Sequence, residues 1–143
     1  MESFLEIDCS GYSKNIIDIL DVFHRIDWWI YNTENEVEYL PIADNDCFNW
    51  KCEKISEEEF RNIINTKKRN SELIGLNLFF NNSNIGISML ARDTKNITFG
   101  ISINCKRLGN GCTDMAWYIE NIIYKLVGVG MRIVSYKFGE FED

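Results

Sequence analysis

The stretch that decides the fold is residues 97–105, Ile-Thr-Phe-Gly-Ile-Ser-Ile-Asn-Cys. Apolar side chains alternate with small or polar ones over the whole stretch, which predicts a strand with one buried face because successive side chains point to opposite sides. Residues 73–80 and 85–91 alternate similarly and are joined by the turn-forming Asn-Asn-Ser-Asn of residues 81–84. These three strands predict an antiparallel meander.

Three helices are predicted from apolar periodicity and capping residues. The first follows Ser13 and places apolar side chains from Ile16 to Ile26 on one stripe. The second begins at Ser56, whose capping box is completed by Glu59, and it ends in the basic turn of residues 67–69. The third, residues 113–127, is apolar on almost every side, so we expect it to be the central core helix.

Shorter alternating runs predict further strands at residues 4–9, 28–32, 36–40, 48–53 and 131–138. The resulting order is β-α-β-β-β-α-β-β-β-α-β. This order indicates an α+β fold, a largely antiparallel sheet covered by about three helices. The 143 residues suit one domain, and no linker-like segment interrupts them.

The charge of the chain is concentrated in one third of it. Residues 27–59 hold ten of the 22 acids and only two lysines, a net charge of −8, whereas the whole chain carries −7. The same segment contains three of the four tryptophans, Trp28, Trp29 and Trp50. Carboxylates that steer an encounter, together with aromatic anchors, are typical of a surface that binds a basic protein. Alternatively, the acids form a solvated face and the tryptophans belong to the core.

Adjacent tryptophans in one strand point to opposite faces, so Trp28 and Trp29 cannot both enter the core. Trp28 shares its side with Ile30 and is therefore our choice for the buried one. The face of the meander strands opposite their apolar side carries small residues. This face is either wet or open to the close approach of a helix or a partner backbone. Its residues are Gly75, Asn77, Gly86, Ser88, Gly100, Ser102 and Asn104.

Several classes of protein fit the sequence poorly. Eighteen consecutive apolar residues are found nowhere, which argues against a membrane protein, and the acidic start lacks the features of a signal peptide, so we expect a cytoplasmic location. The charge of −7 argues against nucleic-acid binding. The five scattered cysteines are typical of reduced thiols, and their spacing matches no zinc motif.

We expect no enzymatic activity, no cofactor and no metal, because the chain contains no catalytic motif. Its single histidine, His24, lies near the edge of a helical apolar stripe and is interpreted as a packing residue. The Gly-Asn-Gly of residues 109–111 lacks the remaining residues of a phosphate-binding loop and is interpreted as a turn.

A compact acidic α+β domain with a localised carboxylate surface resembles the immunity proteins of bacterial toxin systems. The resemblance implies a tight complex in which acids replace nucleic-acid phosphates or cover the active site of a basic, nuclease-type toxin. The candidate partner-binding residues are Trp28, Trp29, Glu34, Glu36, Glu38, Asp44, Asp46 and Trp50. The alternative is a small-molecule-binding or enzymatic domain that uses a pocket between sheet and helices.

Overall fold

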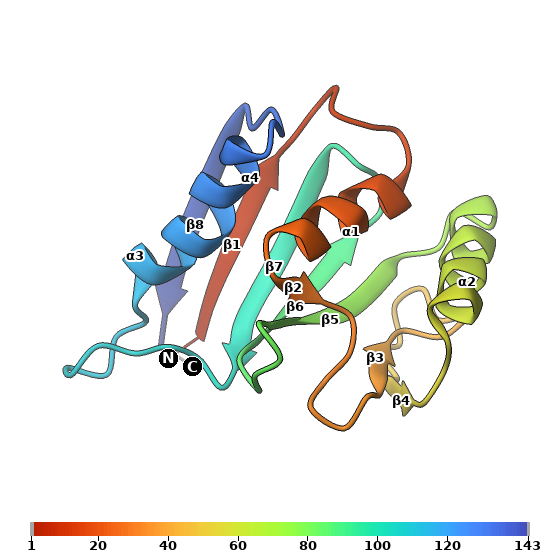
Figure 1. The fold of residues 1–143 in the computed structure, drawn as a ribbon, viewed down its shortest axis with the longest axis horizontal. Helices are drawn as coiled ribbons and strands as arrows, with labels where there is room; N and C mark the ends of the chain where they lie inside the picture. Colours follow the sequence, from red (N-terminus) through yellow and green to blue (C-terminus); the bar gives the residue numbers. More distant parts are fainter. Residues whose placement is uncertain (1, 143) are drawn as a thin grey trace.

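The computed structural model describes residues 2–142, which form an open eight-stranded sheet with helices packed on it (Figure 1). The sheet order is β4-β3-β5-β6-β7-β1-β8, with the short β2 also paired to β5, and each neighbouring pair is antiparallel. The strands are β1 Glu2–Asp8, β2 Trp28–Trp29, β3 Val37–Tyr39, β4 Lys51–Glu53, β5 Ile74–Phe80, β6 Gly86–Ala91, β7 Asn96–Ile103 and β8 Ser135–Phe141. The expected α+β class and element order are confirmed.

The meander forms as predicted, with β5, β6 and β7 as consecutive neighbours in the middle of the sheet. Leu76 and Met89 lie opposite each other, and Met89 in turn lies opposite Phe99. All three side chains are fully buried because this face lies under the helices. The alternation in the sequence therefore corresponds to burial on one face of the sheet.

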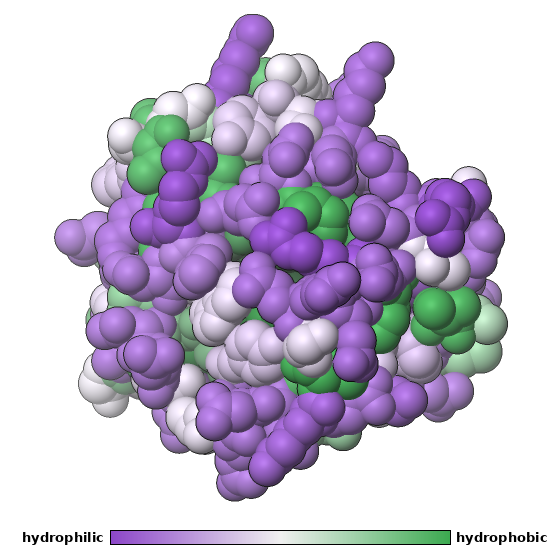
Figure 2. Space-filling view, turned by 45° about the vertical axis from the view of Figure 1, so that its right-hand side comes forward, coloured by the Kyte–Doolittle hydropathy of each residue, from purple (hydrophilic) through white to green (hydrophobic). Residues whose placement is uncertain are grey.

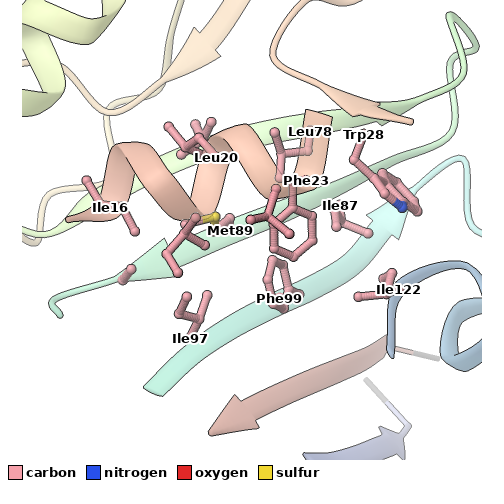
Figure 3. Packing of buried hydrophobic residues seen from close by; sticks show 14 of the residues in the cluster. Ile16, Leu20, Phe23, Trp28, Leu78, Ile87, Met89, Ile97, Phe99 and Ile122 are labelled. Atoms are coloured by element: carbon pink, nitrogen blue, oxygen red, sulfur yellow. The ribbon is translucent and has the colours of Figure 1, made fainter. Parts of the chain in front are cut away.

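Helix α1, Ile16–Arg25, lies across the centre of the sheet. Its N-cap is Asn15, whose side chain accepts a hydrogen bond from the Ile17 amide, so the helix starts later than the expected Ser13. Phe23 of α1 and Phe99 of β7 lie with ring centroids 5.3 Å apart, and Figure 3 shows them at the centre of the buried cluster. This contact fixes the helix over the meander.

Helix α2, Glu57–Arg69, begins at the predicted cap, where Ser56 accepts a hydrogen bond from the Glu59 amide. Its buried Phe60 meets Tyr39 of β3 edge to face at 5.7 Å. The basic turn at its end is only partly a solvated C-terminus, because Lys67 is completely buried. That side chain organises the loop before β4.

The C-terminal helix corrects our expectation of a central core helix. It runs through α3 Met115–Tyr118, a π-helical segment η1 Ile119–Tyr124 and α4 Lys125–Gly128, and it covers the β1–β8 end of the sheet (Figure 1). Only one side of it is buried, while Tyr124 and Val127 are 63% and 54% exposed. The apolar residues all round the helix thus reflect an apolar outer surface.

The small-residue face is the side of the sheet opposite α1. Part of it is covered at close range: a Cβ on Gly75 would lie 2.6 Å from the Leu40 side chain, and one on Gly139 would overlap the Phe4 ring. Gly100 and Ser88, which lie opposite each other, are only partly exposed. The glycines therefore allow apolar side chains of neighbouring strands to lie flat on the sheet.

Candidate functional site

The loop between β3 and β4, residues 41–50, exposes three large apolar side chains. Ile42 is 45%, Phe48 47% and Trp50 40% exposed. In the view of Figure 2, which brings the α2 and β4 side forward, the surface is largely hydrophilic and hydrophobic side chains form separate patches. We call Ile42, Phe48 and Trp50 the loop triad. Aromatic side chains raised from a polar surface are what a protein interface uses as anchors.

The loop is held to α2 by the buried ammonium of Lys67. Its Nζ donates hydrogen bonds to the carbonyl oxygens of Pro41 at 2.7 Å and Asp44 at 2.8 Å, and it lies 3.6 Å from a carboxylate oxygen of Glu72. Burial lowers the pKa of Lys67, while the charges of Glu72 and Asp44 act in the opposite direction. A charged donor on two loop carbonyls fixes the start of the loop to the end of the helix.

The Asp44 carboxylate organises the second half of the loop. One of its oxygens accepts the amides of Cys47 and Phe48, both at 3.1 Å, and the other accepts the amide of Asn49 at 2.7 Å. Phe48 has a φ of +55°, a left-handed conformation that costs a bulky residue energy unless the surroundings impose it. The three amide bonds impose it here, and Phe48 stays on the surface.

Three further hydrogen bonds join the loop to residues that flank β5 and β6. Asn45 accepts the Leu73 amide at 2.8 Å and an Arg92 guanidinium nitrogen at 2.9 Å, both through its side-chain oxygen. The Ala43 amide donates to Glu72 at 2.7 Å. Residues 41–49 are thus hydrogen-bonded at both ends and in the middle, so the triad is pre-organised. A pre-ordered loop loses less conformational entropy when it binds.

Three of the candidate acids, Glu34, Glu36 and Glu38, lie in or next to β3, and they differ in exposure and in hydrogen bonding. Both carboxylate oxygens of Glu38 accept amide hydrogens, from Asn32 at 2.8 Å and from Asn77 at 3.0 Å, and Asn77 accepts the Ser88 hydroxyl at 2.7 Å. Glu38 therefore ends a polar row across the small-residue face. Glu34 is exposed and Glu36 half-exposed.

Cys52 lies opposite Glu38 on β4. Its pKa is raised, first by burial and then by the charges of Glu36 and Glu38. A negative potential therefore exists at this end of the sheet, and Asp46 adds an exposed carboxylate on the loop.

Two of the candidate partner-binding residues are corrected by their placement. Trp28 is fully buried, with its indole nitrogen donating to the Asn121 carbonyl oxygen at 3.0 Å, as the choice of Trp28 for the core requires. Asp44 is buried too and acts on the loop backbone. Neither side chain is available to a partner, so the exposed candidates are Glu34, Asp46 and Trp50, with Glu36 half-exposed.

The remaining tryptophans occupy different surroundings. Trp29 is half-buried and stacks on His24 of α1, with ring centroids 3.5 Å apart, so it lies on the α1 side of the sheet. This stacking agrees with the packing role expected for His24. Trp50 belongs to the loop triad, so the structure groups it with Asp46 and not with the tandem tryptophans.

Sequence reasoning missed Ile42, Phe48 and Lys67. The signal for Phe48 was present, because it is a single large apolar residue within Ala-Asp-Asn-Asp-Cys-Phe-Asn, residues 43–49, where turn-forming residues predominate. Lys67 gave no such signal. A lysine in the last turn of a helix has an ordinary explanation in the helix dipole, and only the fold brings the loop carbonyls to it.

The cavities beside the helices differ in size. The hollow between α1 and α2 holds about 10 Å³, and a cavity of about 250 Å³ lies between the start of α1, the end of α2 and the sheet, where Ile16, Lys68, Ile74, Ala91 and Arg92 are among its lining residues. An apolar cavity of about 560 Å³ lies on the outside, between the C-terminal helix and the start of β8. Within residues 2–142, no cluster of three or more His, Cys, Asp or Glu side chains is placed to hold a metal ion. No helix of this part of the chain has the length and apolar character needed to cross a bilayer.

Comparisons with protein-family models, with curated proteins and with solved structures find no match to this chain.

Proposed function

We propose that this protein binds a basic protein partner through the loop triad and the acids around it, and that it neutralises that partner as an immunity protein neutralises a nuclease-type toxin. The observation that carries the proposal is the loop itself. A buried lysine and a buried aspartate fix nine consecutive residues so that Phe48 and Trp50 stay exposed beside Asp46. Hydrogen bonds that hold an exposed loop in one conformation reduce the conformational entropy that the loop loses when it binds a partner, which is what a binding loop requires.

The charges support a basic partner in particular. Within residues 2–142, Glu34, Glu36 and Asp46 form no ion pair with a lysine or an arginine, so their negative charge is available to an incoming surface. Carboxylates of this kind accelerate association, and the aromatic side chains supply most of the affinity. The hollow of about 10 Å³ between α1 and α2 is too small for a ligand, so the small-molecule alternative would use the cavity of about 250 Å³ between the end of α2 and the sheet.

The proposal is tested by capturing basic proteins from the native cytosol on four immobilised forms of the chain. The wild type and the control Leu108→Ala, altered at an exposed position outside the loop and outside β8, should retain the same protein. Phe48→Ala and Trp50→Ala should each weaken its binding by about 2 kcal/mol, the scale of an interface hot spot. A captured protein that all four forms bind alike contradicts the assignment of the surface.

The charge component is measured separately, by stopped-flow association with the captured protein. Reversing Glu34, Glu36 and Asp46 to lysine should slow association and reduce its dependence on ionic strength, while the melting temperature stays unchanged. Neutralisation requires a further result: one equivalent of the wild-type chain abolishes the partner's nuclease activity, and the Trp50→Ala form does so only at higher concentration. A partner without any activity to inhibit leaves binding without neutralisation.

A further inference from the structure

Strand β8 forms an edge of the sheet and exposes a long ladder of backbone groups. It spans seven residues, Ser135–Phe141, and pairs with β1 on one side only. Ser135, Tyr136, Lys137, Glu140 and Phe141 are exposed. Proteins usually shorten, charge or cover such an edge because its free N–H and C=O groups recruit another strand.

An exposed apolar surface lies beside this edge. Tyr124 and Val127 of the C-terminal helix, Val134 and Tyr136 border the cavity of about 560 Å³, and at the other end of the same helix Met115 is exposed. The helix runs antiparallel to β8, because the Thr113 amide just before it donates to Glu140 near the strand's end, at 2.7 Å. Apolar side chains thus border both ends of the strand.

We propose that β8 is the interface of a homodimer, in which it pairs antiparallel with β8 of a second copy about a two-fold axis at Phe138. In this register Lys137 lies opposite Gly139 and Tyr136 lies opposite Glu140 of the other copy, so no like charges meet. In this register each pair joins two residues an even number of positions apart in β8, and such residues point to the same face of the strand. Because opposite residues in an antiparallel pair also share a face, the helices of both copies lie on the same side of the joined sheet.

Two further observations favour a second copy as the occupant. The two-fold axis brings the Tyr124, Val127 and Tyr136 end of one copy level with the Met115 end of the other, so apolar surface meets apolar surface. Residues 115–142 contain three acids and three bases, a net charge of zero, whereas residues 27–59 carry −8. Two identical copies repel each other least through their neutral end.

The dimer leaves the loop triad of each copy free, because β4 and β8 are opposite edges of the sheet. It therefore adds to the proposed function without depending on it. A dimer of this form would present two binding loops, one at each end of a continuous sixteen-stranded sheet, twice the eight strands of one copy.

The test compares two substitutions at one exposed position by sedimentation velocity over a concentration series. The wild type should dimerise. Tyr136→Glu places a carboxylate opposite Glu140 at two symmetric positions, and Tyr136→Lys places an ammonium there, so the glutamate variant should dimerise about tenfold more weakly than the lysine variant. Both remove the same ring from an exposed site, and equal melting temperatures of the diluted monomers control for folding.

Hydrogen exchange of residues 135–141 supplies the second readout, since their amides should become protected as the wild-type concentration rises and those of residues 51–53 should not. A wild-type chain that stays monomeric at every concentration overturns the proposal. A dimer that both variants form equally well, or that leaves residues 135–141 unprotected, overturns it as well, because the contact then lies elsewhere.

Discussion

At one edge of the sheet, β4 is three residues long and carries Lys51 and Glu53 as an ion pair at 3.2 Å. At the other edge, β8 is seven residues long and exposes the side chains of Tyr136 and Phe141. The short, charged β4 edge disfavours pairing with another strand, and the exposed apolar side chains at this end lie on a loop that hydrogen bonds fix in place. At the β8 edge the strand itself is available. The difference indicates two kinds of contact: side-chain anchors at one end and backbone pairing at the other.

The largest loss of stability is expected at Trp28, which contacts both the middle of the sheet and the C-terminal helix. Trp28 of β2 contacts Phe80 of β5 at 5.0 Å between ring centroids and donates to Asn121 of the C-terminal helix. Trp28→Ala should lower the free energy of unfolding by about 3–5 kcal/mol, the usual range for truncating a buried large aromatic. Trp29→Ala, at a half-buried position, should cost less. Urea denaturation measures both, and equal losses contradict the assignment of Trp28 to the core.

The next largest loss of stability is expected at Lys67, beside the β4 edge, and not at Lys125, beside the β8 edge. Lys67→Met removes the ammonium from two buried carbonyls and should cost about 3 kcal/mol. Lys125→Met, in the C-terminal helix, loses a surface contact to Asp27 at 3.7 Å and a cation–π contact to the Phe80 ring at 5.1 Å, and should cost about 1 kcal/mol. Urea denaturation gives the stabilities, and hydrogen exchange of residues 43–49 reports loosening of the loop. A Lys67→Met protein as stable as Lys125→Met would show that the loop does not depend on Lys67.

A smaller effect separates the two aspartates of the loop. Asp44→Asn keeps one acceptor oxygen for three amides and should cost about 1–2 kcal/mol, whereas Asp46→Asn should leave stability unchanged. In partner binding the order changes, because Asp46 is exposed and its loss slows association. Thermal melts and stopped-flow association measure the two quantities. An Asp46→Asn protein with the lower melting temperature contradicts this division.

The sequence predicts most of the fold because periodicity and caps are local signals. The alternation of residues 97–105 and the Ser56–Glu59 cap are confirmed. The prediction of a central core helix at residues 113–127 was wrong, because an exposed apolar side of a helix has the same composition as a buried one. The loop could not be predicted for a different reason: Asp44 and Lys67 look like surface charges until the fold brings carbonyls and amides to them.

The smallest effect is a pH dependence that compares one glutamate from each edge. A hydrogen bond from the Tyr39 hydroxyl, assisted by Lys51, lowers the pKa of Glu53, and the Thr113 amide lowers the pKa of Glu140. Because both values are lower in the folded state, each group contributes stability above its unfolded pKa of about 4.3 and loses it as the pH falls through the folded value.

Glu53→Gln and Glu140→Gln should therefore each flatten the loss of stability between about pH 5 and pH 3, without changing its sign. Added salt should reduce the Glu53 contribution more, since Lys51 forms an ion pair with it, whereas the largest contribution to the lowered pKa of Glu140 comes from the Thr113 backbone amide and the charge of Arg107 adds less. Melting temperatures over this pH range, at low and high salt, measure the difference. Equal salt sensitivity at the two edges would mean that the ion pair on β4 contributes nothing to its glutamate.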